Sequence, residues 1–300
     1  MLAPVAACLV LAAGIGAAIA ATPERLVAAF LAGDRLELGR TGWNLGAGGL
    51  ADELVSADRE RSLAALAAAP HAEDGHALLM PLSEIARSPD RPRAVAAARA
   101  AEAIARELDR GRARELDIPA ELLADAAGAW RAIAADPGRW VDVRIDALDA
   151  SLALAGAAGT RSDEELDSLL ADDDPEIRRA ALERWPQPLD DERRALAGER
   201  ARSDPEDDVA ATALQALCGG IAAGDAPSPI LHALEDDGMA RLRALLSGAP
   251  DGVSEAALID AAMCAASAAD DESRRALSEF RGRLDDATGA ILDARLEWLE

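Results

Sequence analysis

The sequence predicts an all-α protein built from stacked pairs of helices. Alanine and leucine dominate the composition, whereas the 300 residues include no Tyr and only two Phe. Alanine and leucine favour helices, and the β-branched and aromatic residues that favour strands are scarce. Apolar residues recur at helical spacing, and a short motif opened by Asp-Pro returns at a nearly constant interval. Such internal repetition is typical of helical-repeat arrays.

Residues 1–20 have the features of an export signal. No charged side chain occurs before Glu24, and an apolar run ends in Ala18-Ile19-Ala20. Small residues at this spacing are the pattern that signal peptidases cut after. About 20 apolar residues can also just span a bilayer. We therefore expect an exported protein of the bacterial periplasm or cell surface, with residues 1–20 as a signal peptide or an uncleaved N-terminal anchor. Membrane contact is expected only through that segment.

Residues 21–50 are predicted to hold one helix and a loop. The helix covers Pro23 to Ala32, and the glycine-rich stretch Asp34 to Gly49 is predicted to be the longest non-helical segment. Residues 51–300 are predicted to form the repeat domain. Its first units are Ser56 to Ala68 and the helix that follows Ser88-Pro89-Asp90 and runs to Glu107.

The clearest repeat unit begins at Asp172 and ends at Trp185. Acidic residues and Pro175 favour a helix N-terminus, where the helix dipole attracts carboxylates. Apolar residues then follow on one helical face: Ile177, Ala181, Leu182 and Trp185. The pattern returns 32 residues later, after Asp204-Pro205, and occurs 34 residues earlier, after Asp136-Pro137.

This pattern resembles the HEAT-repeat family, in its short bacterial form Asp-Pro-x-x-Val-Arg-x-x-Ala-Leu, over residues 136–218. The resemblance implies an α-solenoid, a right-handed superhelix of stacked antiparallel helix pairs, and implies binding to another protein. It also implies a ladder of Asp and Arg side chains between neighbouring repeats, formed here by Arg144, Asp172, Arg178 and Asp204, with Asp172 as the partner of Arg178. Because Gly138 and Ala210 replace two members, we expect the ladder to be incomplete and its contribution to be modest, as for exposed ion pairs.

Second helices are expected between the motif helices, followed by atypical C-terminal capping helices. The predicted second helices are Glu73 to Ile85, Ala120 to Ala135, Ser162 to Ala171, Asp190 to Arg202 and Pro227 to Asp236. The predicted C-terminal helices are Asp251 to Ala269, Glu272 to Leu284 and Asp286 to Trp298. Terminal repeats often depart from the consensus because they cap the stack.

The charge balance argues against two classes of partner. Asp and Glu number 55 against 31 basic residues, all of them Arg, and the net charge is -24. Nucleic-acid binding requires a basic surface, and an anionic membrane repels an acidic one. We therefore expect a protein partner and no nucleic acid.

The candidate chemical groups are few. His71 and His76 flank Ala-Glu-Asp-Gly, which favours a polar loop over a metal site because i, i+5 spacing separates two rings on a helix. No nucleophile motif, dinucleotide fingerprint or calcium loop occurs, and no cofactor is expected. Cys218 and Cys264 lie 46 residues apart without a CxxC motif. We expect two buried thiols, and a disulfide in an oxidising compartment is the alternative.

One basic cluster and one tryptophan are candidate partner contacts. Arg193, Arg194, Arg200 and Arg202 share a predicted second helix and could bind carboxylates or phosphates in bidentate fashion. The alternative is a solvated helix face balanced by neighbouring Glu. Trp130 is either a core residue or a hot spot on a concave surface.

Together these features predict a non-enzymatic scaffold of the cell envelope that binds a partner on the concave face of the array. The alternative is a HEAT-like enzyme or small-ligand carrier, similar to bilin lyases, whose pocket cannot be recognised in the sequence. That alternative requires a pocket of roughly 300 Å³ or more.

Overall fold

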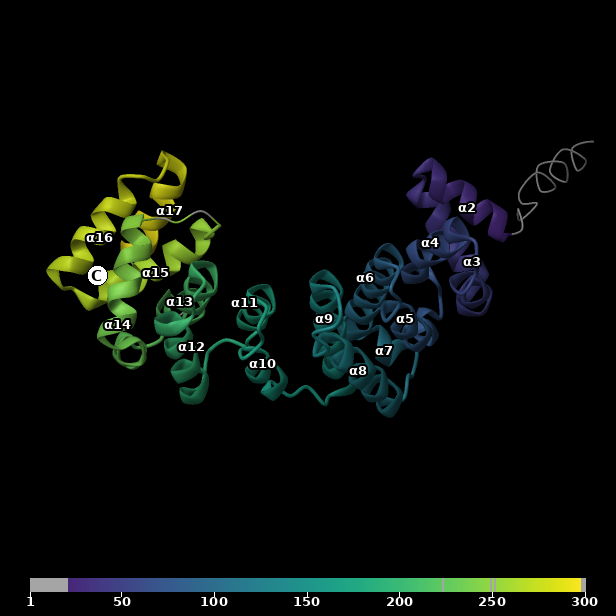
Figure 1. Cartoon of the computed structure of the whole chain (residues 1–300), viewed down its shortest axis with the longest axis horizontal. Coiled ribbons are helices and arrows are strands. Elements are labelled where there is room, and N and C mark those ends of the chain that lie inside the picture. Colours follow the sequence, from purple (N-terminus) through teal and green to yellow (C-terminus); the bar gives the residue numbers. More distant parts are fainter. Residues whose placement is uncertain (1–20, 223, 249, 251, 298–300) are drawn as a thin grey trace, which may run out of the picture. The chain divides into compact units, whose positions relative to one another are not determined.

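The computed structural model describes residues 21–222, 224–248, 250 and 252–297, and all regular structure in these ranges is helical (Figure 1). The all-α prediction is confirmed for this part of the chain. The predicted signal or anchor, residues 1–20, lies outside the described residues. Of the helices that are described, none is both long enough and apolar enough to cross a bilayer.

The chain divides into two compact units, unit 1 (Met1–Arg161) and unit 2 (Ser162–Glu300). This division was not predicted, because the repeat pattern runs across it. The last helix of unit 1 ends at Ala158, and Gly159 follows as its C-cap with φ 70°, in the left-handed conformation.

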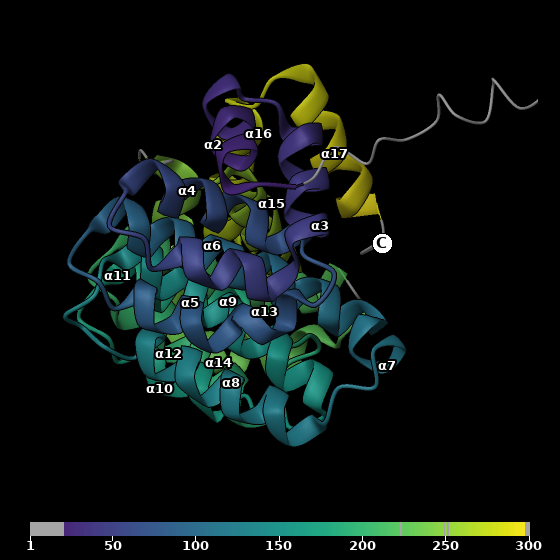
Figure 2. The same ribbon diagram turned by 90° about the vertical axis from the view of Figure 1, so that its right-hand side faces the viewer.

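Unit 1 contains two layers of helices, preceded by the N-terminal pair α2 and α3, which packs against α4 (Figure 2). Helices α4, α6 and α9 are consecutive neighbours in one layer, and α5 packs beside α8 in the other. The bounds are α2 (Pro23–Ala32), α3 (Arg35–Leu54), α4 (Arg59–Ala68), η1 (Ala69–His71), η2 (Gly75–Leu78), α5 (Leu79–Ala86), α6 (Arg91–Glu107), the π-helical turn η3 (Leu108–Arg112), α7 (Ala113–Glu115), α8 (Ala120–Ala134) and α9 (Val141–Ala158).

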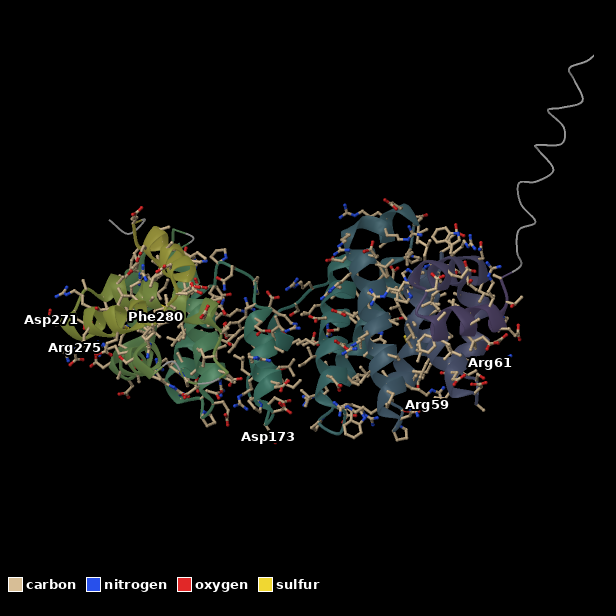
Figure 3. The ribbon with its side chains drawn as sticks, turned by 90° about the horizontal axis from the view of Figure 1, so that it is seen from above. Arg59, Arg61, Asp173, Asp271, Arg275 and Phe280 are labelled. Carbon is tan, nitrogen blue, oxygen red and sulfur yellow. A yellow bond between two sulfur atoms is a disulfide. The ribbon has the colours of Figure 1, made fainter. Side chains whose placement is uncertain are left out.

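Alanine lets the helices of unit 1 pack closely. On α6 the fully buried positions Ala94, Ala97, Ala98 and Ala101 recur at intervals of three and four residues and form one apolar face. Arg59 of α4, by contrast, is exposed at the surface of the unit (Figure 3). Three predicted helices are confirmed, and their ends lie within one residue of the prediction: Pro23 to Ala32, the helix that ends at Glu107, and Ala120 to Ala135.

The predicted loop over Asp34 to Gly49 is wrong, because α3 runs through it. Gly42 allows this helix to approach α4, since a Cβ at Gly42 would lie 2.9 Å from Cβ of Ala68. The helix is interrupted at Gly46, with φ 64° and ψ -178°. Asp74 accepts a hydrogen bond of 2.6 Å from the Ala47 amide just after this break. Tertiary packing therefore stabilises a helix that glycine by itself disfavours.

Unit 2 has the same arrangement of two layers. Helices α11, α13 and α15 follow one another in the first layer, and α12, α14 and α16 in the second. The bounds are α10 (Glu164–Leu169), α11 (Pro175–Glu183), α12 (Asp191–Ser203), α13 (Asp207–Ala222), α14 (Pro227–Gly248), α15 (Glu255–Ala268), α16 (Asp271–Arg281) and α17 (Asp286–Leu296).

Helix starts in unit 2 follow the acidic turns that predicted them. Asp174 caps α11 by accepting a 2.9 Å hydrogen bond from the Glu176 amide, with Pro175 in the first turn. Asp173, in the same turn, points to the surface (Figure 3). The three predicted C-terminal helices occur as α15, α16 and α17, each slightly shorter than predicted at one end or both.

Helix α14 extends beyond the predicted end at Asp236. It continues to Gly248 across a break at Glu235, where φ is 55°. Helix breaks free backbone carbonyl groups, and Arg202 donates a 2.6 Å hydrogen bond to the carbonyl oxygen of Ala233 at this point. Gly198 of α12 makes room for this contact, since a Cβ there would lie 2.2 Å from the same oxygen.

The expectation of two free thiols is wrong. Cys218 of α13 and Cys264 of α15 form a disulfide, with their Cα atoms 5.5 Å apart. Because α13 and α15 are neighbours in the first layer, residues distant in sequence are brought within the ordinary range for a disulfide. The bond crosslinks two successive helix pairs of unit 2.

Candidate functional site

Arg178 connects two consecutive Asp-Pro turns of unit 2. Its Nε and Nη2 atoms each donate a 2.8 Å hydrogen bond to the two carboxylate oxygens of Asp204. Its Nη1 donates to the backbone carbonyl oxygens of Asp172 and Asp173 at 2.9 and 3.1 Å. The guanidinium group therefore contacts the turn before its own helix and the turn before the next motif helix.

The predicted partner of Arg178 and the comparison of the ladder with exposed ion pairs both need correction. Asp172 contributes its carbonyl group to Arg178, and the carboxylate that pairs with Arg178 is that of Asp204. The two side chains are only 8% and 0% exposed, so the pair is buried and not an exposed ion pair. Removing one member of a buried pair leaves an uncompensated charge, a larger effect than losing an exposed pair.

Hydrogen bonding keeps the Asp204 carboxyl ionised in its buried position. Burial alone would raise its pKa, but the hydrogen bonds from Arg178 and from the Glu206 amide outweigh burial and lower the pKa. The hydrogen bond to Asp204 raises the pKa of the Arg178 guanidinium. Both groups are therefore charged at neutral pH.

The other two ladder residues, Arg144 and Asp172, each make a hydrogen bond to a backbone group. Arg144 is 2% exposed, and its Nε donates a 2.8 Å hydrogen bond to the carbonyl oxygen of Ala134 at the end of α8. The carboxylate of Asp172 accepts a 2.9 Å hydrogen bond from the Asp174 amide and so shapes the turn before α11. Both residues stabilise helix ends.

The arginines of α12 form ion pairs and hydrogen bonds within unit 2, and their role as partner contacts stays a prediction. Arg193 lies against Asp163, Asp167 and Asp190 and is 16% exposed. Arg194 donates to the carbonyl oxygen of Leu189 and pairs with Asp191.

The two remaining arginines of α12 also contact their own unit. Arg200 approaches Asp204 to 4.0 Å, and Arg202 contacts Ala233 and Glu235 of α14. The cluster therefore holds α12 against its neighbours.

Trp130 is a core residue of unit 1, so its prediction as a partner contact is wrong. Its side chain is 0% exposed on the buried face of α8. Trp185, 4% exposed, is likewise buried, and its Nε1 donates a 2.9 Å hydrogen bond to Asp167. The packing interpretation applies to both tryptophans.

The strongest candidate binding site is a pocket of about 680 Å³ in unit 1, here called the unit 1 pocket. It is formed by the first half of α3, the η1–η2 segment, the end of α6 and the η3–α7 segment. Its basic residues are Arg40, Arg106, Arg110, Arg112, His71 and His76. Its acidic residues are Glu73 and Glu107. An arginine-rich pocket is unusual in a chain whose net charge is -24.

Arg112 and Trp43 form one wall of the unit 1 pocket. The guanidinium carbon of Arg112 lies 5.9 Å from the centre of the Trp43 ring, a cation–π arrangement. Nη2 of Arg112 also donates a 3.3 Å hydrogen bond to the carbonyl oxygen of Glu73. Trp43 remains 47% exposed. The stack holds both side chains at the pocket surface without burying them.

In the described part of the chain, the other three arginines of the unit 1 pocket pair with glutamates three or four residues away. Arg40 contacts Glu37 at 2.6 Å and is 63% exposed. Arg106 contacts Glu102 and Arg110 contacts Glu107, each at 2.5 Å. Local pairs of this kind on a helix surface are weak. These guanidinium groups can therefore turn toward a ligand with only a small loss of free energy from the broken ion pairs.

The two histidines predicted to lie in a polar loop do lie between α4 and α5. The His71 ring packs against α3 at Gly39, where a Cβ would be 3.5 Å from its Cγ. His76 has a buried Nδ1 atom without a hydrogen-bond partner. Among the described residues, no group of three or more His, Cys, Asp and Glu could hold a metal ion. The histidines belong to the pocket wall.

Sequence reasoning missed Trp43 and the pocket arginines. Arg106, Arg110, Arg112 and Arg114 form a short arginine-dense stretch in an acidic chain, which is a signal that could have drawn attention. Trp43 was assigned to a loop, and no local pattern indicates that α3 brings it to the same place.

Comparisons with known proteins do not assign this chain to a family. No family model matches the sequence, and no curated protein is similar to it. Among solved structures, the chain is similar to an engineered protein that is 18% identical, with a TM-score of 0.41 over 91% of this chain and 77% of that chain. A likeness at this level carries no argument about fold or function.

Proposed function

We propose that this chain is a HEAT-like α-solenoid that acts as a non-enzymatic scaffold of the cell envelope and binds another protein. The observation that carries the proposal is the Arg178–Asp204 pair, which connects the turn before one motif helix to the turn before the next. The layers of successive helices within each unit support the same conclusion. Stacked repeats form an extended surface suited to protein partners.

The second-helix layer of unit 1 is the proposed partner surface. Met80 of α5 and Leu122 of α8 are 49% and 59% exposed on neighbouring helices. Methionine is enriched at adaptable interfaces. The arginines of α12 play no part in this surface, because they are engaged within unit 2.

Two features support the proposed location outside the cytoplasm. The sequence of residues 1–20 resembles an export signal, and Cys218 and Cys264 are joined in a disulfide. Disulfides persist in oxidising compartments and are rare in the cytosol. The proposed compartment is the periplasm or the cell surface of a bacterium.

The test is chemical crosslinking and affinity capture of the full-length chain from a cell envelope, at low and high salt. We expect one protein to be retained at stoichiometric level and to be lost from the double variant Met80→Asp, Leu122→Asp. Val55→Asp is the matched control, because Val55 is 72% exposed but lies in the turn between α3 and α4. Equal losses from both variants, or no retained protein at either salt, would contradict the scaffold proposal.

A small-ligand carrier or lyase-like enzyme is the second candidate function. The observation that favours it is the unit 1 pocket, whose volume of about 680 Å³ lies within the range of small-molecule sites. Binding experiments with purified protein test this candidate without reference to any protein partner.

A further inference from the structure

We propose that the unit 1 pocket binds a small amphiphilic anion, a carboxylate or phosphate attached to an apolar body. This site is separate from the proposed partner surface, and it supplies a ligand class for the second candidate function. Its basis is the contrast between the pocket and the rest of the chain. Four arginines line the pocket although acidic residues outnumber basic ones 55 to 31 overall.

Arg112 is positioned to bind the oxyanion. A guanidinium group carries five N–H donors in one plane, and the hydrogen bond from Arg112 to Glu73 uses one of them. The guanidinium carbon of Arg112 lies over the Trp43 ring, 5.9 Å from the ring centre, and a guanidinium group that stacks on an aromatic face keeps the N–H groups of its edge for hydrogen bonding. Bidentate contact along that edge is the geometry in which arginine binds carboxylates and phosphates. Stacking on Trp43 also limits the rotamer freedom that Arg112 loses on binding.

Arg106 and Arg110 add charge on the α6–η3 side of the same pocket. Their partners Glu102 and Glu107 lie within one helical turn, and both arginines are more than half exposed. Exposed pairs contribute at most about 1 kcal/mol, so an incoming oxyanion can compete for these guanidinium groups. A ligand that carries negative charge would thus replace weak local pairs with several simultaneous contacts.

The apolar part of the lining favours an amphiphile over an inorganic ion. Ile104 and Leu108 are apolar lining residues of the pocket and are 5% and 3% exposed. Trp43 and Leu116 leave 47% and 38% of their surfaces exposed in the same lining. Covering this apolar surface removes it from water, which favours binding by roughly 25 cal/mol per Å². An inorganic anion would gain the arginine contacts but none of this burial.

The local backbone keeps the two sides of the pocket together. Asp74 lies between the two histidines in sequence and accepts the hydrogen bond from the Ala47 amide at the break in α3. The same helix carries Arg40 and Trp43. The η1–η2 segment is thereby fixed to α3, and the pocket exists before any ligand arrives. Preformed sites bind small molecules with a smaller entropy loss.

Isothermal titration calorimetry of the full-length chain tests the proposal with four probes: hexyl phosphate, hexanoate, 1-hexanol and inorganic phosphate. We expect hexyl phosphate or hexanoate to bind at least about ten-fold more tightly than 1-hexanol and inorganic phosphate. Tighter binding of hexyl phosphate identifies a phosphate as the headgroup, and tighter binding of hexanoate identifies a carboxylate. Affinities of both anionic amphiphiles no better than those of 1-hexanol would overturn the proposal.

Two arginine variants locate the binding. Arg112→Gln should weaken the better amphiphile about ten-fold, because it removes the guanidinium group on Trp43. Arg114→Gln is the matched control: Arg114 is exposed two residues away and does not line the pocket. Equal effects of the two variants would also overturn the proposal. Tighter binding of a capped acidic peptide than of either amphiphile would overturn the proposal too, because the pocket would then be a protein-docking site.

A third variant tests whether weaker binding comes from the loss of the stacking contact or from a folding defect. Trp43→Leu keeps an apolar side chain but removes the aromatic face on which Arg112 stacks. We expect it to weaken both anionic amphiphiles while circular dichroism spectra and thermal midpoints of all variants match the parent chain. Unchanged amphiphile affinity in correctly folded Trp43→Leu and Arg112→Gln would place the binding elsewhere and reject the site.

Discussion

Arg178 and Asp204 form a buried bidentate ion pair between α11 and the turn that precedes α13. The pair is satisfied on both sides, since Arg178 also donates to two carbonyl groups and Asp204 also accepts from the Glu206 amide. Full hydrogen bonding is what allows two charges to remain inside a protein. The pair fixes the distance between consecutive motif helices in unit 2.

Arg178→Met should lower the free energy of unfolding of unit 2 by about 3 to 5 kcal/mol, because Asp204 would remain buried without its counter-charge. Arg274→Gln is the control. It removes an exposed pair with Asp271, and the expected loss is below about 1 kcal/mol. Urea unfolding followed by circular dichroism measures both values. If the two variants lose equal stability, the buried pair is no stronger than a surface pair.

Helix starts were predictable because their chemistry is local. Asp174 and Pro175 lie next to the backbone groups that they cap or replace, so the sequence alone indicates where α11 begins. The same reasoning failed for α3, where glycine disfavours a helix locally and the close contact between Gly42 and Ala68 restores it. Only the folded chain contains that contact.

The pocket and the disulfide were not predictable, for a different reason. Trp43, His71 and Arg112 come from three separate segments, and no spacing connects them in sequence. Cys218 and Cys264 meet because α13 and α15 are successive first-layer helices. Sequence periodicity indicates which face of each helix is buried. It does not say which residues of neighbouring helices lie opposite each other.

Asp146→Asn should stabilise unit 1 at pH 7.5. Asp146 of α9 is 20% exposed, and Nε of Arg99 lies 3.7 Å from its carboxylate. Burial, together with the nearby negative charge of Glu102, raises the pKa of its carboxyl to about 6. Above pH 6 the ionised carboxylate therefore destabilises the folded state. One pKa unit corresponds to about 1.4 kcal/mol, so the gain on substitution should be roughly 2 to 3 kcal/mol.

The sign of the pH dependence follows from the same pKa. As the pH falls through 6, the folded protein binds a proton at Asp146 before the unfolded chain does, and the parent chain gains relative stability. Below the ordinary pKa of about 4 both states are protonated, and the difference between parent and Asp146→Asn should vanish. Urea midpoints between pH 4 and pH 8 check this. A stability difference that does not change over this range would contradict the raised pKa.

Reduction of the Cys218–Cys264 disulfide should destabilise unit 2. The bond closes a loop whose ends are 46 residues apart, and disulfides of this kind typically contribute about 2 to 4 kcal/mol by restricting the unfolded chain. The double variant Cys218→Ser, Cys264→Ser should unfold at a lower urea concentration than the oxidised parent chain. Added reductant should lower the midpoint of the parent chain and leave that of the variant unchanged. A reductant effect on the variant would show that another group is responsible.

Gly198→Ala should destabilise unit 2 although alanine is the better helix former. In a free helix the change would be worth up to about 1 kcal/mol in favour of alanine. At this position the new Cβ would lie 2.2 Å from the carbonyl oxygen of Ala233, so α12 and α14 must separate or distort. The hydrogen bond from Arg202 to that oxygen would be strained as well.

Gly128→Ala is the matched control, since Gly128 is also inside a helix but has open space around it. We expect Gly128→Ala to raise the free energy of unfolding by about 0.5 to 1 kcal/mol and Gly198→Ala to lower it by about 1 to 3 kcal/mol. Thermal and urea unfolding of the two variants measure these changes. If Gly198→Ala is as stable as Gly128→Ala, the close approach of α12 to the break in α14 does not contribute to the stability of the layer.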